Sequence, residues 1–235
     1  MSSANRLIGG MSIVLVPLLF GIGDQLRMAA EPPTGLGSVD PDYGVAEATA
    51  TLASIDANRG LFLAASYLVL LAVLLSFPAM LAVWRLSVEG APRWAWVGAT
   101  LAALGIIGQA VHLAGYFGLS LAFSAFHDLG VAAELFVATG VNSFLIALFV
   151  PFLLGLLAPI PQVVGLRRAR IIPLWAALAV VAGVAVMVIA GSTPATSAFT
   201  AILLAAGLFP AARTMLRTHE PPATTHSVRT VPGPA

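Results

Sequence analysis

One short apolar stretch carries three side chains that could do chemistry: an amide, an imidazole and a phenol. In the sequence GIIGQAVHLAGY, which spans residues 105–116, Gly105, Gln109, His112 and Tyr116 recur three or four residues apart. On an α-helix this spacing places them on one face. An imidazole beside a phenol can bind a polar group, relay protons or act as general acid and base. The stretch therefore predicts a polar stripe on a helix, and its surroundings decide what the stripe does.

The composition indicates that this helix lies in a membrane. Of the 235 residues, 59% are hydrophobic and only 9% are charged, and the mean hydropathy is +0.98, whereas soluble domains contain about 25% charged residues. The chain has no cysteine, which excludes disulfides, thiolate metal sites and thiol nucleophiles. All its basic residues are arginines and alanine abounds, which suggests a GC-rich bacterial genome. We expect a single all-α integral membrane domain.

Apolar runs long enough to cross a bilayer predict a six-transmembrane-helix bundle. The helices are expected over about 7–23, 45–86, 93–120, 141–164, 172–190 and 195–215, within a membrane domain over 1–216. The run over 45–86 has no breaker, so it is expected to be continuous and to project beyond the bilayer. Proline, glycine and aspartate predict an external loop over 24–44. We expect a short interfacial helix within 127–139 and a disordered cytoplasmic tail over 217–235.

The arginines predict how the bundle is threaded, because cytoplasmic loops are enriched in basic residues. With the N-terminus inside and six helices, nine of the eleven arginines are cytoplasmic and eight of the ten acids are external. Arg27 and Arg59 are the two external arginines. Both termini are therefore expected in the cytoplasm, in a multi-pass protein of the cell membrane. The first run also resembles a signal peptide, but it is longer than a usual signal core.

Polar residues from several segments are expected to gather at the outer end of the bundle. Three of them, His112, Asp24 and Glu134, are candidates for donating or accepting protons in catalysis. The other candidates would bind a ligand: Gln109, Tyr116, Gln25, Asn142, His127 and Asp128. Unpaired polar groups are costly at membrane depth, so these should face one another or an outward-facing cavity. The alternative is that the stripe only hydrogen-bonds between helices and the acidic loops form a solvated face.

The sequence predicts no metal and no cofactor. Its four histidines do not form the transbilayer pairs that a haem would need, and no HExxH, GxSxG or phosphate-loop motif occurs. We expect membrane lipid and a lipophilic small molecule as partners, and no nucleic acid. Whether the protein forms a homo-oligomer is left open by the sequence.

In its layout the chain resembles a family of small six-helix bacterial membrane proteins of unknown function. The resemblance rests on the long external segment before the second helix, on Pro-Arg-Trp at 92–94 and on Pro-Leu-Trp at 173–175. It implies a fold but no functional residues. Three functions are left open: a binder of a lipid or lipophilic molecule, a membrane-embedded acid–base enzyme such as an isomerase or cyclase of an isoprenoid-like substrate, and a small transporter or transporter subunit.

Overall fold

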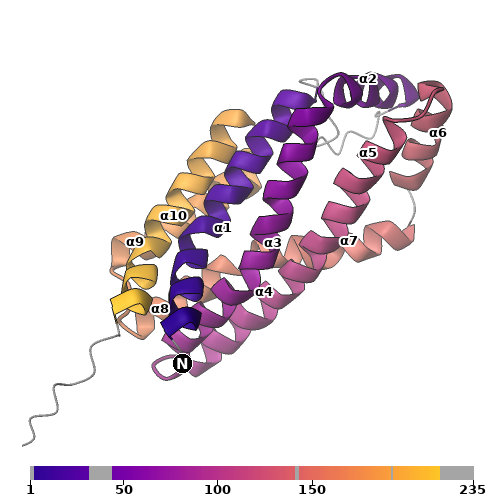
Figure 1. The fold of residues 1–235 in the computed structure, drawn as a ribbon. Coiled ribbons are helices and arrows are strands. Elements are labelled where there is room, and N and C mark those ends of the chain that lie inside the picture. The colour runs from indigo at the N-terminus through magenta and orange to yellow at the C-terminus, as the bar shows by residue number, and fades with distance from the viewer. Residues whose placement is uncertain (1–2, 32–43, 141–142, 192, 218–235) are drawn as a thin grey trace, which may run out of the picture.

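The computed structural model describes residues 3–31, 44–140, 143–191 and 193–217, and every regular element in these ranges is a helix (Figure 1). The elements are α1 (Ser3–Ala30), α2 (Val45–Ala57), α3 (Arg59–Val88), α4 (Pro92–His112), the π-helix η1 (Leu113–Gly118), α5 (Leu119–Phe123), α6 (Leu129–Gly140), α7 (Ser143–Leu156), α8 (Pro159–Arg168), α9 (Leu174–Ile189) and α10 (Pro194–Arg217).

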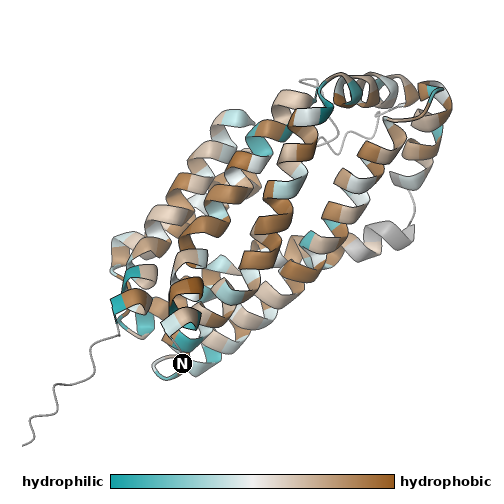
Figure 2. Ribbon diagram, in the orientation of Figure 1, coloured by the Kyte–Doolittle hydropathy of each residue, from teal (hydrophilic) through white to brown (hydrophobic). Residues whose placement is uncertain are grey.

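Five helical segments in these ranges are long and apolar enough to cross a membrane. They are Ser3–Ala30, Arg59–Val88, Pro92–Phe123, Phe149–Arg168 and Pro194–Arg217. The apolar helix α9 is shorter, at 16 residues. Strongly hydrophilic residues gather at the end of the bundle near the N-terminus and on α2 at the opposite end (Figure 2). These features indicate a multi-pass membrane protein.

The helices form two walls. In the first wall α1 packs along α3 and α10, and α9 packs on α10. In the second wall α4 packs against α7 and α8, and the walls join where α3 meets α4 and where α8 meets α9. The short helix α2 lies across one end of the bundle and contacts α6 (Figure 1).

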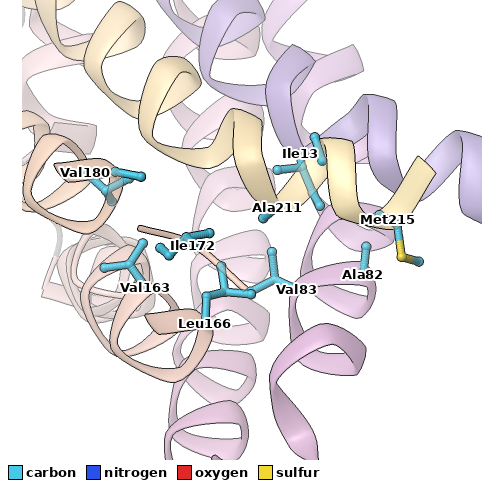
Figure 3. Close-up of a cluster of buried hydrophobic side chains, with 11 residues drawn as sticks. Ile13, Ala82, Val83, Val163, Leu166, Ile172, Val180, Ala211 and Met215 are labelled. Carbon is cyan, nitrogen blue, oxygen red and sulfur yellow. The ribbon is translucent and has the colours of Figure 1, made fainter. Parts of the chain in front are cut away.

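Buried apolar side chains hold the two walls together at the end opposite α2 (Figure 3). The cluster joins Ile13 of α1, Val83 of α3, Leu166 of α8, Val180 of α9 and Met215 of α10, each at most 4% exposed. One contiguous cluster therefore ties helices from the start, the middle and the end of the chain.

The first helix is longer than the apolar pattern predicts. The loop expected to begin at residue 24 does not, because α1 continues through Ala30. Asp24 pairs with Arg27 three residues on, and Arg27 pairs with Glu31 four residues on, which are spacings that favour a helix. The helix contains Pro17, and the next prolines in the sequence are Pro32-Pro33; a helix usually ends before such a residue. The helix thus continues past the apolar run and ends shortly before these prolines.

Two expected helices are each divided in two. The chain turns between α2 and α3 at Asn58, whose φ of −112° and ψ of 29° are not helical and whose side-chain amide donates to the Ser54 carbonyl (2.9 Å). The single projecting helix predicted over 45–86 is therefore wrong. The helix predicted over 141–164 is also divided, between α7 and α8, because Pro159 suits the first turn of a new helix.

Glycines allow α4 and α7 to cross with their backbones in contact. A Cβ added at Gly105 would lie 2.8 Å from the Cα of Gly155, and a Cβ at Gly108 would overlap the backbone of Phe152. Small residues at such crossings are a common way for membrane helices to associate, because lipid provides no hydrophobic driving force between them. The position of α7 therefore depends on these glycines.

We predict that Gly108→Ala destabilises the protein by about 1–3 kcal/mol, the usual cost of overpacking, because the backbone of α7 must move. Gly60→Ala is the matched control, since a Cβ at Gly60 in α3 meets nothing within 4 Å. Thermal unfolding of both variants in one detergent measures the difference. Equal melting temperatures would show that the crossing tolerates a methyl group.

Candidate functional site

A cavity of about 600 Å³ lies between the two walls of the bundle. On α1 its lining runs from Ile13 to Arg27, and on the second wall it runs from Ala102 of α4 to Phe117 of η1. At 1.5 Å per helical residue these stretches measure about 20 Å, so the cavity is elongated along the bundle. Most of its lining is apolar, including several side chains from α7 and α10.

One end of the cavity, which we call the polar end, is bordered by an ion-pair cluster. The Arg27 guanidinium donates to Asp24 Oδ1 from Nε (2.9 Å) and Nη2 (2.7 Å), and to Glu31 Oε2 from Nη1 (2.6 Å). Nη1 also lies 3.3 Å from the Tyr116 hydroxyl, which donates in turn to Glu31 Oε1. Four side chains thus join the end of α1 to the π-helix.

The cluster is buried to different depths. The side chain of Glu31 is 2% exposed and that of Arg27 is 11% exposed, whereas that of Asp24 is 27% exposed. Burial raises the pKa of the Glu31 carboxyl above its usual value, and the charge of Arg27 and the Tyr116 hydroxyl partly offset this. Because a buried charge without a partner is costly, the cluster is stable only as a set.

His112 lies beside this cluster, within a group of aromatic rings. Its imidazole stacks on the Tyr116 ring, with centroids 5.2 Å apart and planes 13° apart, and on the Phe152 ring, at 5.0 Å and 26°. Phe149 stacks on Phe152 at 4.5 Å. In the part of the chain that the structure describes, neither the His112 imidazole nor the Gln109 amide has a hydrogen-bond partner. Both side chains line the cavity.

The π-helix gives this part of the site its local geometry. The α-helical pattern of α4 ends at His112, and η1 follows over Leu113–Gly118 before α5 resumes. A π-helix inserts an extra residue into the helical turn and is frequent at functional sites. Gly105, Gln109, His112 and Tyr116 nevertheless all line the cavity, as the spacing of the stripe predicts.

The structure brings together only some of the residues proposed from the sequence. Asp24, Gln109, His112 and Tyr116 line the cavity. Gln25 donates instead to the Pro194 carbonyl (2.6 Å), at the start of α10. The remaining members of the set do not line it: His127 is exposed, Asp128 accepts from the backbone N–H groups of Gly130 and Val131 at the start of α6, Glu134 is exposed on α6, and Asn142 lies outside the described residues.

Two central members of the ion-pair cluster, Arg27 and Glu31, are not among the residues proposed from the sequence. Arg27 and Glu31 were placed in an external loop, although Asp24, Arg27 and Glu31 have the spacing of an acid–base–acid series on one helix face. Phe149 and Phe152 were also missed, because two phenylalanines in an apolar run give no sequence signal of their own. Their role follows from the crossing of α4 and α7.

No protein-family model matches the chain, and no curated protein or solved structure matches it either. The apolar helices indicate a multi-pass helical membrane protein, and the comparisons assign it to no family. The resemblance in layout to small six-helix proteins stays a prediction.

The ion-pair cluster predicts a large difference between two arginines. We expect Arg27→Gln to lower the free energy of unfolding by about 3 kcal/mol, because it leaves the buried Glu31 carboxylate without its cation. Arg59→Gln should cost less than about 1 kcal/mol, since Arg59 pairs with Asp56 at 3.7 Å on an exposed surface.

The double variant Arg27→Gln/Glu31→Gln tests the cause of that loss. Removing both charges should recover part of the stability, which a double-mutant cycle of chemical unfolding in detergent would measure. Strictly additive losses would show that the two side chains do not act as a pair.

Proposed function

We propose that this chain is a multi-pass membrane protein of bacteria that binds a lipid or a lipophilic small molecule in the cavity between its two walls. The observation that carries the proposal is the cavity itself, which combines long, mostly apolar walls with a group of polar side chains toward one end. Its volume of about 600 Å³ falls within the range of small-molecule sites, which are mostly apolar with a few placed polar groups.

The arrangement of the helices supports access for such a ligand. In the second wall α7 packs chiefly on α4, while α9 packs on α10 in the first wall. Phe149 and Phe152 of α7 face the cavity, as do Thr196 and Ser197 of α10 on the opposite wall. A lipophilic ligand would enter between these elements from the bilayer, without crossing the polar ends of the bundle.

The proposed topology has six crossings, with both termini in the cytoplasm. The sixth crossing would be α9, which runs antiparallel to α10, because Gly207 lies against Ala176 and Gly183 lies against Leu203. The arginine distribution then places the polar end of the cavity toward the outer face of the membrane. The cavity would be outward-facing in this orientation.

The second candidate is an acid–base enzyme acting on an isoprenoid-like substrate in the same cavity. The observation that favours it is the position of His112, whose imidazole lines the cavity and stacks on a phenol that donates to a buried carboxylate. A His–Tyr pair of this kind can move protons to and from a substrate. A transporter would use the same binding site.

The binding proposal predicts a bound molecule in the purified protein. Native mass spectrometry of the protein in detergent should show a discrete added mass, and Ala102→Phe should remove it by filling the cavity that Ala102 lines. Ala110→Phe is the matched control, because Ala110 is exposed on the same helix and does not line the cavity.

The comparison of these two variants decides the proposal. Loss of the mass in Ala102→Phe alone locates the ligand in the cavity. An added mass that persists equally in both variants would place the bound molecule elsewhere, and the binding function of the cavity would be rejected.

A further inference from the structure

The dimensions and the lining of the cavity specify what class of molecule it holds. We propose that the ligand has a hydrocarbon chain and an uncharged planar head group, such as a quinone ring, that packs beside the aromatic group of His112 and Phe152 and hydrogen-bonds to Gln109 and His112. This inference rests on the proposed binding function and goes beyond it, because it excludes ligands with charged head groups, phospholipids among them.

The charges of the lining argue for an uncharged head. Asp24 and Arg27 are the charged residues that line the cavity within the described part of the chain, and they pair with each other at 2.7 Å. The Arg27 guanidinium already donates to two carboxylates, so it offers no unbalanced charge to a phosphate. The cluster carries one more negative than positive charge, but the Asp24 side chain is 27% exposed, so solvent screens this charge and a cationic head gains little. Moving an anionic head out of water would cost free energy with no free cation to offset it.

The aromatic rings argue for a planar head. His112, Tyr116, Phe149 and Phe152 all line the cavity, and their stacked planes differ by 13° to 30°. Aromatic pairs favour offset stacking, which adds about 0.5–1.5 kcal/mol beyond the burial of area. A flat ring fits beside this group, whereas a branched or tetrahedral head group does not gain the stacking.

The two polar side chains of the stripe argue for a head that forms hydrogen bonds. The Gln109 amide both donates and accepts, and a neutral imidazole donates from one nitrogen and accepts at the other. Neither side chain has a hydrogen-bond partner within the described residues. The carbonyl oxygens of a quinone ring would accept from both, at no cost in buried charge.

The length of the cavity argues for a hydrocarbon chain. Its lining extends about 20 Å along α1. Away from the polar end the lining is mostly apolar, with Ile13, Val83, Leu204 and Leu208 beside one amide, that of Gln162. A hydrocarbon chain can lie along this part.

The test compares probes that differ only in the head group. Phosphatidylcholine nanodiscs that contain the full-length protein would be equilibrated by dialysis with empty nanodiscs in the presence of one probe at a time. The probes are decyl-naphthoquinone, dodecyl phosphate and dodecyltrimethylammonium. Binding is measured as the amount of probe in the protein-containing nanodiscs above that in the empty ones. We expect about one decyl-naphthoquinone per protein, bound at least about tenfold more tightly than either charged probe. Phosphatidylcholine should not remain bound when native mass spectrometry strips the disc.

Variants locate the head group. Since stacking contributes about 0.5–1.5 kcal/mol, His112→Gln should weaken decyl-naphthoquinone binding by about twofold to tenfold. Gln109→Leu should do the same through a lost hydrogen bond. His127→Gln is the matched control and should leave binding unchanged, because His127 is exposed and does not line the cavity. Melting temperatures would verify that the variants are folded.

The outcomes separate this inference from the proposed function. If a charged probe binds at least as tightly as decyl-naphthoquinone and is displaced by Ala102→Phe, the cavity binds lipophiles but the inferred head group is wrong. The inferred head group is also wrong if the wild-type protein retains phosphatidylcholine and Ala102→Phe does not. If no probe exceeds the empty discs and no molecule is retained, both the inference and the binding function are rejected.

Discussion

The half of this structure that contains the polar end of the cavity depends on the burial of one guanidinium group. Moving an arginine out of water costs several kcal/mol unless its donors are satisfied and its charge is balanced. Arg27 meets both conditions, because Asp24 and Glu31 lie three and four residues from it on the same chain segment and Tyr116 reaches them from the π-helix. The cluster therefore does more than extend α1. It fixes the distance between the end of α1 and η1, and with it the width of the cavity at its polar end.

The opposite half of the bundle is held by close packing. Buried side chains from five segments join the walls around Ile13 and Leu166. Nearer the polar end of the cavity, the glycine crossing fixes α7 against α4. In lipid, such contacts provide the attraction between helices, because exposed apolar surface costs little there. The walls are joined at one end by the buried apolar cluster and at the other by the ion-pair cluster. The space between the walls cannot close without breaking one of these two sets of contacts. The cavity is therefore a consequence of how the helices pack and pair.

The sequence predicts well those features that depend on a local period. The all-helical class follows from composition, and the stripe from Gly105 to Tyr116 lines the cavity because residues three or four apart share a helix face. Features that depend on where a helix stops were predicted poorly. Reading the helix end from the last apolar residue put Arg27 and Glu31 in a loop, whereas side-chain pairs carry α1 on to the prolines. Phe149 and Phe152 could not be predicted, since their place at the site depends on a crossing between two helices distant in sequence.

The site contains polar groups that the protein itself does not satisfy, and this has a thermodynamic consequence. Arg27 has its donors occupied, but Gln109 and His112 face an apolar cavity without a hydrogen-bond partner among the described residues. Both side chains are half-buried, and a polar group in that state loses part of its hydration without gaining a hydrogen bond, which costs free energy. Water relieves the cost only where enough polar neighbours hold it, and most of this lining is apolar. A molecule that supplies hydrogen bonds at the stripe and hydrocarbon along the walls removes both penalties at once. The ion-pair cluster thus builds the site, and the unsatisfied stripe provides the free energy with which it would bind.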